Sequence, residues 1–401
     1  MTARFVLAGD IGATHTRLQL APLRPGSLAH LPPGRPAHLP AGHSADPPPG
    51  HEETRALPVV TGGGFNVHAS GSGGLAAFLD TARRAFGQLP GAAVIAAAHL
   101  GISGAGAARH GEIEPLVRDE LARLGEGSGI GVDPARIRVS DDLITAFTSA
   151  ASDLPEQSSA SPSGILLLAG SGAACVRYLE GREVSRVDGM GWLLGDVGSG
   201  IWLGRRALEA AAADLDGRGP ATALTASVLG ALGIDPLGER GRDSQARPQE
   251  APVRPGAYAG ERLPGPSSKS DARTQLIRAA YALSPAEWGR FGPLVSALAD
   301  PVGADGASTG ADSPDLVARS IAAEAVEALL HHVELVADPD QGPTTVVLAG
   351  SVLAGDGAYA PIGRLVRYAL TRSGHTVVEA RSPLAGALSL ARAEAAAHDI
   401  P

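Results

Sequence analysis

The stretch LAGDIGATHTRLQL, residues 7–20, places glycines and polar side chains between two apolar runs. Its turn begins with the carboxylate of Asp10, and the groups that follow include Gly12, Thr14, Thr16 and Arg17. A carboxylate cannot bind a phosphate directly, but it can hold a hydrated Mg²⁺ that bridges phosphate oxygens. The pattern therefore predicts a strand, a turn and a second strand that bind metal and phosphate. A plain β-hairpin is the alternative for one such turn taken alone.

Two further apolar runs end in turns of small residues. They are LAGSGAAC at 168–175 and VLAGSVLAG at 347–355. Glycine accepts positive φ values, so backbone N–H groups and hydroxyls in such turns can point at an anion. The candidate phosphate-binding residues in these turns are Gly170, Ser171, Gly172, Gly350 and Ser351. Three such turns in one chain favour nucleotide binding over three unrelated hairpins.

The basic residues exclude two classes of nucleotide site. Lys269 is the single lysine of the chain, and it lies in a Pro/Ser-rich stretch. A P-loop needs a lysine inside its glycine-rich turn, and a site like that of protein kinases needs a lysine on a strand. Backbone amides, hydroxyls and a metal ion must therefore bind any nucleotide phosphate here.

Length and composition set the frame for these motifs. A chain of 401 residues exceeds one ordinary domain, so two domains are expected. The net charge of −9 argues against a nucleic-acid partner, and no stretch of about 18 apolar residues predicts a membrane span. The first residues do not form a signal-peptide pattern, and Cys175 is the single cysteine, so a cytoplasmic protein is expected.

Strand and helix patterns alternate along the chain, which is typical of an α/β fold. A Ser/Pro-rich break at 152–163 separates two halves, and residues 165–179 repeat the pattern of residues 7–20. Two segments, 22–56 and 236–272, are rich in proline and glycine and have no periodicity. We expect them to be low-complexity inserts.

The order of the three turns, together with GMGWLLGDVGSGIWLGRRAL at 189–208, resembles the superfamily of sugar kinases, actin and Hsp70. Within it, the chain is similar to the N-acetylglucosamine kinase branch, also called BadF/BadG-like ATPases. The resemblance implies two actin-like (ribonuclease H-like) domains, at 1–148 and 149–401, with mixed β-sheets flanked by helices. It also implies that ATP, Mg²⁺ and a sugar bind in the cleft between the domains, and that the protein is a homodimer.

The resemblance also implies roles for individual residues. The family has a general base after the strand that precedes the hinge, and RVSDDLITAF supplies Asp142 there, with Asp141 as the second candidate. Such a carboxylate accepts the proton of a sugar hydroxyl that attacks the γ-phosphate, although this pair could also serve only as a helix cap. Asp10 would hold Mg²⁺ through water. The implied sugar-binding residues are Asn66, Ser103, Gly191 and Asp196.

These matches imply an ATP-dependent kinase of an amino sugar, with N-acetylglucosamine at its 6-hydroxyl as the first candidate. Glucosamine, N-acetylmuramic acid and other hexosamines remain alternatives, because Met190 and Val197 replace the Trp and Glu that are usual in the family. A sugar-responsive regulator that keeps the fold without catalysis is the alternative from a different class. Activators of 2-hydroxyacyl-CoA dehydratases and ROK kinases are disfavoured, since they need cysteine or Cys/His motifs that this sequence does not contain.

Overall fold

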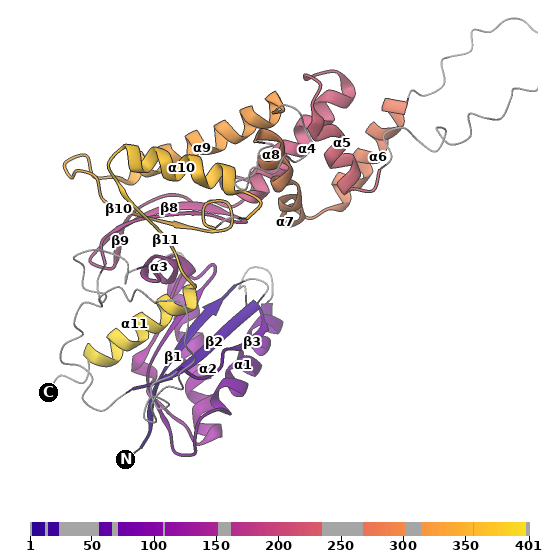
Figure 1. Ribbon diagram of the computed structural model, residues 1–401. Coiled ribbons are helices and arrows are strands. Elements are labelled where there is room, and N and C mark those ends of the chain that lie inside the picture. Colours follow the sequence, from indigo (N-terminus) through magenta and orange to yellow (C-terminus); the bar gives the residue numbers. More distant parts are fainter. Residues whose placement is uncertain are drawn as a thin grey trace, which may run out of the picture. The chain divides into compact units, whose positions relative to one another are not determined.

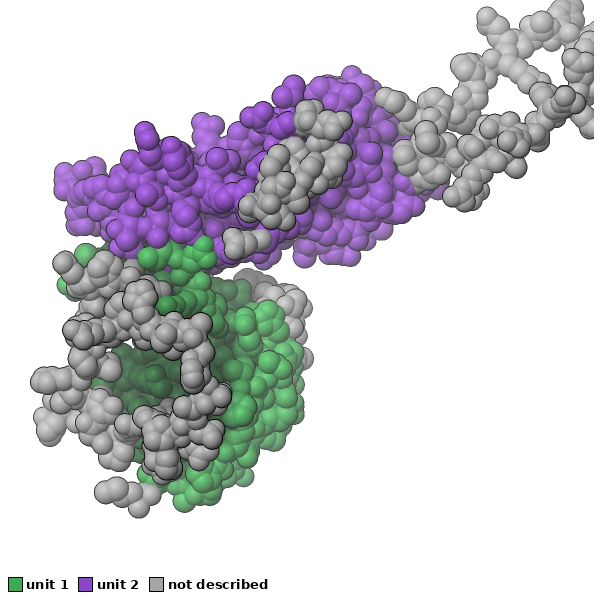
Figure 2. Space-filling view, viewed as in Figure 1, with its two compact units in different colours: residues 1–166, 178–184, 378–401 green, residues 167–177, 185–377 purple. Residues whose placement is uncertain are grey.

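Two compact units make up the chain, whose elements are shown in Figure 1 and whose units are coloured in Figure 2. Unit 1 contains residues 1–166, 178–184 and 378–401, and unit 2 contains residues 167–177 and 185–377. The computed structural model describes residues 2–12, 15–23, 56–65, 71–106, 109–150, 162–234, 268–300, 314–355 and 357–397.

The first sheet is mixed and has six strands. They are β1 (Arg4–Ile11), β2 (His15–Pro22), β3 (Val60–Gly63), β4 (Val94–Ile102), β5 (Gly131–Val132) and β6 (Ile137–Ser140). Their order is β3-β2-β1-β4-β5, and β6 also pairs with β4. β4 is parallel to β1, β5 and β6, whereas β2 is antiparallel to β1 and β3. The carboxyl ends of β1, β4 and β6 therefore meet at one edge of the sheet.

Helices cover both faces of this sheet. They are α1 (Gly71–Phe86), α2 (His110–Ser128), α3 (Asp142–Thr148) and α11 (Pro383–Ala397). α1 and α2 enclose the main core of unit 1, which includes the fully buried Phe78 and Ile113. On the other face, α11 packs against β1, β4 and α3, and its side chains contact Val6 and Ala8. Because both faces are covered, β1 and β4 are nearly continuous apolar runs.

The second sheet repeats the strand order of the first. Its strands are β7 (Gly164–Ala169), β8 (Ala173–Leu179), β9 (Arg182–Asp188), β10 (Thr345–Ala349) and β11 (Thr376–Glu379). Their order, β11-β10-β7-β8-β9, matches β6-β4-β1-β2-β3 of the first sheet strand for strand. The repeat that the sequence predicts between residues 7–20 and 165–179 is therefore a pair of equivalent hairpins, β1–β2 and β7–β8.

Seven helices of unit 2 lie within the described ranges. They are α4 (Gly200–Asp216), α5 (Ala223–Ala231), α6 (Ser268–Ala282), α7 (Pro285–Trp288), α8 (Gly292–Ala299), α9 (Leu316–Val336) and α10 (Ala360–Arg372). α4 contacts α5, α6, α7, α8 and α9 and is the centre of this group. It begins at the N-cap Ser199, whose side chain accepts a hydrogen bond from the N–H of Trp202, and ends at Gly217 in the left-handed conformation. Among the described helices, none is long and apolar enough to cross a membrane.

The observed units differ from the expected domains at the C-terminus. The second domain was expected to run from 149 to 401, but residues 378–401 group with unit 1 because α11 covers a face of the first sheet. The expected inserts 22–56 and 236–272 fall mostly outside the described residues. At their edges the structure is regular, since β2 continues to Pro22 and α6 begins at Ser268.

Candidate active site

Three polar residues lie where parallel strands of the first sheet end. Asp10 is near the end of β1, Ser103 follows β4, and Asp142 comes shortly after β6. The carboxyl ends of such strands are where open α/β sheets place ligand-binding residues. The N–H of Ser103 donates to the carbonyl oxygen of Ile11 at 2.8 Å, so the ends of β1 and β4 are tied together. The structure thus brings these three predicted site residues to one edge.

Asp142 is the first residue of α3 and is partly buried. Desolvation raises its pKa to about 6, the charges of Asp141 and Asp10 raise it too, and a hydrogen bond from the side chain of Ser103 lowers it. A carboxylate with this pKa is mostly ionised at neutral pH, yet it takes up a proton more readily than an ordinary aspartate. This is the protonation behaviour that a general base needs.

Asp141 has a different position from its neighbour. It is the N-cap of α3, with extended backbone angles, and its Oδ1 accepts a hydrogen bond from the N–H of Ile144 at 3.4 Å. A carboxylate at this place satisfies a free helical N–H and interacts favourably with the helix dipole. The helix-cap interpretation of the Asp pair therefore describes Asp141, and Asp142 is left with its side chain near Ser103.

Arg17 lies directly opposite Asp10 in the antiparallel pair of β1 and β2. Its Nη2 is 2.7 Å from Oδ2 of Asp10, and the carboxylate of Asp10 is buried. The arginine therefore compensates the charge of a buried aspartate, which would otherwise be costly to desolvate. A direct contact of Arg17 with phosphate stays a prediction.

The chemistry of Asp10 fits a magnesium ligand. Apart from the ion pair with Arg17, the buried Oδ2 accepts no hydrogen bond from the described residues. Mg²⁺ keeps several waters and is usually held by one or two carboxylates together with phosphate oxygens of the substrate. The described residues contain no group of three or more His, Cys, Asp or Glu side chains placed to hold a metal. A single carboxylate beside phosphate oxygens is enough for this ion.

The other predicted site residues of unit 1 form hydrogen bonds within the protein or lie outside the described residues. The N–H of Gly12 donates to the carbonyl oxygen of His15 at 2.9 Å and closes the β1–β2 turn. Thr16 is fully buried, and its hydroxyl donates to the carbonyl oxygen of Gly63 at 2.8 Å. Thr16 thereby fastens β2 to β3, and its role at a phosphate stays a prediction. Thr14 and Asn66 lie outside the described residues.

The two glycine turns of unit 2 lie against each other. Gly350 has a φ of +85°, and a Cβ at this position would lie 2.3 Å from the carbonyl oxygen of Ala169. The N–H of Val352 donates to that same oxygen at 2.9 Å. Only glycine fits so close to the end of β7. The turn of Gly170, Ser171 and Gly172 therefore contacts the turn of Gly350 and Ser351, and both serines are exposed.

The N-terminus of α4 lies beside the first of these turns. The N–H of Gly200 donates to the carbonyl oxygen of Gly170 at 2.7 Å, and Ser199 caps the helix. The N–H groups of Gly200 and Trp202 are thereby bonded within the fold. What the helix N-terminus adds to the glycine turns is the positive end of the helix dipole, which favours a phosphate. Unit 2 thus has the backbone groups that the sequence analysis requires in place of a lysine.

Asp196, predicted to bind sugar, is buried beside the same turn. Its Oδ1 accepts a hydrogen bond from the N–H of Ala173 at 3.2 Å, and a Cβ on Gly172 would lie 3.1 Å from its Oδ2. Desolvation raises the pKa of Asp196, the charge of Asp188 raises it further, and backbone hydrogen bonds from Ala173 and Gly191 lower it. The predicted residues Gly172, Gly191 and Asp196 are therefore neighbours.

Asp188 belongs to this site although the sequence analysis does not single it out. Its Oδ1 accepts hydrogen bonds from the N–H groups of Asp196 at 2.7 Å and Met190 at 3.3 Å, and its Oδ2 accepts one from Val197 at 2.9 Å. One carboxylate thus holds both ends of the loop 190–197. The sequence signal is only an aspartate before a glycine-rich run, and its left-handed φ of +62° is visible only in the structure.

A family model described as the BadF/BadG/BcrA/BcrD ATPase family matches residues 95–391. The match covers most of the chain and includes Ser103, Asp142 and all the unit 2 residues named above. The chain belongs to the BadF/BadG/BcrA/BcrD ATPase family. The resemblance stated from the motifs is therefore confirmed for the family. Among curated proteins, none matches the sequence.

Two solved structures of similar fold cover nearly the whole of this ATPase. One is a "putative N-acetylglucosamine kinase" from Chromobacterium violaceum, 21% identical, covering 96% of this chain and 98% of that chain with a TM-score of 0.57. The other has the same description and comes from Porphyromonas gingivalis, 17% identical, with the same coverages and a TM-score of 0.50. At these identities the likeness shows the fold. The predicted fold class, mixed sheets flanked by helices, is confirmed.

The glycine loop of this BadF/BadG/BcrA/BcrD ATPase exposes apolar side chains. Met190, which stands where a tryptophan is usual, is 64% exposed, and Leu193 and Leu194 are exposed as well. Gly191 has a φ of +82°, and its carbonyl oxygen accepts a hydrogen bond from the N–H of Leu194 at 3.1 Å. A methionine side chain adapts its shape more easily than a tryptophan ring. The loop therefore combines a hydrogen-bonded backbone with an exposed apolar surface.

Proposed function

We propose that this ATPase is a kinase that transfers the γ-phosphate of ATP to a hydroxyl of an amino sugar, with N-acetylglucosamine at its 6-hydroxyl as the first candidate substrate. The observation that carries the proposal is the state of Asp142. It is a partly buried carboxylate with a pKa raised to about 6, it lies beside Ser103, and Asp10 lies close enough to raise that pKa. Transfer of a phosphoryl group to an alcohol needs such a group to accept the proton of the hydroxyl.

The reaction assigns one step to unit 1. The sugar oxygen forms a bond to the γ-phosphorus, the bond between that phosphorus and the departing ADP oxygen breaks, and the proton of the sugar hydroxyl passes to a carboxylate oxygen of Asp142. The side chain of Ser103 donates a hydrogen bond to Asp142 and so favours its ionised form. Asp141 remains the helix cap throughout.

The phosphates require positive groups, and this chain supplies them without a lysine. The glycine turns at 170–172 and 350–351 offer backbone N–H groups and the hydroxyls of Ser171 and Ser351. The N-terminus of α4 adds the positive end of its helix dipole. Asp10 would hold Mg²⁺, which when bound supplies charge neutralisation at the phosphate oxygens. Chelation of divalent cations is expected to abolish turnover, and turnover in excess chelator would contradict the role of Asp10.

The choice of an amino sugar rests on the family and on the residue types. Sugar hydroxyls need paired donors and acceptors, and a buried carboxylate such as Asp196 penalises a substrate that leaves it unpaired. The two structural neighbours described above carry the name N-acetylglucosamine kinase. We further propose a cytoplasmic homodimer, for which the mass in solution is the direct test.

The test is an ATP-consumption assay with a panel of hexoses and hexosamines, run on the wild type and on Asp142→Asn. We expect turnover with N-acetylglucosamine, phosphate on the 6-hydroxyl of the product, and loss of turnover in the variant. Turnover with glucosamine or N-acetylmuramic acid instead would keep the kinase and change the substrate. Sugar binding by calorimetry without turnover of any panel member would favour a regulator and contradict the proposal.

A further inference from the structure

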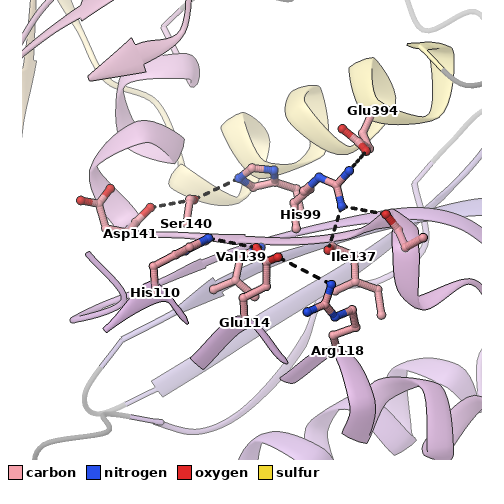
Figure 3. A network of polar contacts seen from close by, with 11 residues as sticks. His99, His110, Glu114, Arg118, Ile137, Val139, Ser140, Asp141 and Glu394 are labelled. Carbon is pink, nitrogen blue, oxygen red and sulfur yellow. Dashed lines mark hydrogen bonds and ion pairs between the residues drawn. The ribbon is translucent and has the colours of Figure 1, made fainter. Parts of the chain in front are cut away.

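A partly buried hydrogen-bond chain connects β4 to the residue before Asp142 (Figure 3). His99 lies on β4, next to Arg138 in the register of β4 and β6. Its Nε2 is 3.0 Å from the hydroxyl oxygen of Ser140, the last residue of β6. The hydroxyl of Ser140 in turn donates to the carbonyl oxygen of Asp141 at 2.9 Å. The chain thus runs from the middle of the sheet to the first turn of α3.

The direction of these bonds defines the state of the imidazole. Because the one hydroxyl proton of Ser140 goes to the carbonyl of Asp141, Nε2 of His99 must be the donor in the first bond. Burial and the nearby charge of Arg138 lower the pKa of His99 to about 4, so the ring is neutral at physiological pH. We therefore expect His99 to be the Nε2–H tautomer. In this form Nε2 donates to Ser140 and does not accept a proton during catalysis.

The carbonyl at the end of the chain belongs to the peptide bond between Asp141 and Asp142. That peptide unit is planar, so a bond that fixes the carbonyl direction also fixes the N–H and the Cα of Asp142. Because Asp142 is the first residue of α3 and has a helical φ, its side-chain direction follows from this plane. At this point β6 ends and α3 begins, and Asp141, the N-cap, still has extended backbone angles. The hydroxyl of Ser140 therefore acts on the one peptide plane through which Asp142 is oriented.

Further polar contacts from α2 and α11 hold β6 in place. Glu114 on α2 accepts a hydrogen bond from the N–H of Val139 at 3.3 Å, and it is flanked by His110 at 3.2 Å and Arg118 at 3.9 Å. Nearby, Arg138 forms an ion pair of 2.8 Å with Glu394 on α11. These contacts hold β6 as far as Val139. Ser140 is the last residue of the strand, so its hydrogen bond sets the direction in which the chain enters α3.

We propose that His99, acting through Ser140, is a positioning residue that holds Asp142 in the orientation needed for proton transfer. The proposal rests on the proposed function, since it assumes that Asp142 is the base. His99 touches neither substrate nor phosphate in this scheme. Its contribution is to turnover and not to substrate affinity.

The test compares variants that differ in the donor. His99→Leu removes it at similar side-chain size, whereas His99→Gln keeps an N–H near the place of Nε2. We expect His99→Leu and Ser140→Ala to lower kcat by about 10-fold to 100-fold, as for a catalytic group displaced by less than about 1 Å, with the KM for sugar and ATP unchanged. His99→Gln and Ser140→Thr should recover most of the rate. The double variant His99→Leu with Ser140→Ala should be no slower than either single variant.

Glu394→Gln is the matched control, because it breaks a neighbouring ion pair in the same network without reaching Asp141. It should keep the wild-type kcat even if its melting temperature falls. A ring-nitrogen NMR spectrum gives a readout that does not depend on activity. We expect the signature of a protonated Nε2 and an unprotonated Nδ1 for His99, with the preference reduced in Ser140→Ala.

Three outcomes would overturn the inference. They are an unchanged kcat in both His99→Leu and Ser140→Ala, a kcat loss in Glu394→Gln as large as theirs, or an Nδ1–H tautomer of His99. Failure of the proposed function is a separate result, because the wild type would then turn over no sugar of the panel, or Asp142→Asn would retain turnover. If Asp142→Asn is inactive while His99→Leu turns over normally, the function stands and only the positioning role of His99 is lost.

Discussion

Two adjacent aspartates divide the start of α3 between them. Asp141 is the N-cap, and its carboxylate is engaged with the N–H of Ile144, whereas Asp142 lies beside Ser103. We predict that Asp142→Asn keeps the side-chain size but lowers kcat by roughly 10²–10⁴-fold, the range for loss of a general base. Asp141→Asn should retain turnover and cost at most about 1 kcal/mol of unfolding free energy, since asparagine is also a good cap. Steady-state kinetics and thermal melts of both variants check this, and reversed phenotypes would show that Asp141 is the base.

The pH dependence of the rate follows from the same carboxylate. A general base must be ionised, and desolvation together with the charges of Asp141 and Asp10 raises the pKa of Asp142 to about 6. The guanidinium of Arg17 forms an ion pair with Asp10. We predict that kcat/KM rises with pH, is half-maximal near pH 6 and is level above about pH 7. Initial rates between about pH 4.5 and 8 measure this, and an activity that is level across that whole range would contradict the raised pKa.

The raised pKa has a cost in stability whose sign can be stated. Asp142 has a higher pKa in the folded protein than its ordinary value of 3.8, so between about pH 4 and 6 the folded state binds more protons than the unfolded one. Stability therefore falls as pH rises through this window. At pH 7, the free energy of unfolding of Asp142→Asn should exceed that of the wild type by about 1–2 kcal/mol. A shift of two pKa units corresponds to roughly 3 kcal/mol, and the partial exposure of Asp142 reduces this value. Near pH 4 this difference should vanish in denaturant titrations, and a variant less stable than the wild type at pH 7 would contradict the argument.

At the scale of elements, the loop 190–197 depends on one side chain. Asp188 accepts hydrogen bonds from both ends of the loop, and a Cβ on Gly195 would lie 2.1 Å from its Oδ1, so the backbone closes tightly around this carboxylate. We predict that Asp188→Ala frees the amides of Asp196 and Val197. They should exchange with deuterium at least tenfold faster, and the KM for sugar should rise, because Asp196 loses its fixed backbone.

Asp188→Asn is the control for this prediction. Asparagine tolerates the left-handed φ of +62° and keeps one acceptor oxygen, so it should fall between the wild type and the alanine variant. Unchanged amide exchange in Asp188→Ala would show that the loop is held by other contacts.

The elements also show what could be predicted from the sequence. β1, β7 and β10 were predicted because apolar runs reflect burial directly. β9 was missed, since its residues are largely exposed and charged and its pairing with β8 is fixed by the sheet. The Asp141–Asp142 pair was found through the family resemblance, which could be applied because strand end, carboxylates and helix are contiguous in the sequence. Asp188 and His99 were missed, since each acts through backbone groups whose direction only the folded chain defines.

At the scale of the whole molecule, the C-terminal helix completes the unit formed by the N-terminal half. No local pattern could assign α11 to unit 1, because its partners β1, β4 and α3 lie more than about two hundred residues earlier. Its close approach to α3 occurs at Gly386, where a Cβ would lie 1.9 Å from the carbonyl oxygen of Thr145 and 2.8 Å from the N of Ser149. The hydroxyl of Ser149 also accepts a hydrogen bond from the N–H of Arg381 at 2.9 Å. α11 is therefore part of the support for the helix that begins with Asp142.

We predict that Gly386→Val separates α11 from α3 and lowers both stability and turnover. Overpacking of this kind costs about 1–3 kcal/mol, and a shift of α3 should displace Asp142 and reduce kcat. Ala385→Val is the matched control, since Ala385 is the preceding residue of the same helix and is exposed, so valine there makes no contact with α3. Helix propensity alone would make Ala385→Val the less stable of the two variants, because valine is a poorer helix former than alanine but a better one than glycine. The melting temperature and kcat of the two variants test this, and we expect both to be lower in Gly386→Val than in Ala385→Val. Equal values for both would mean that the base in unit 1 does not depend on the C-terminal helix.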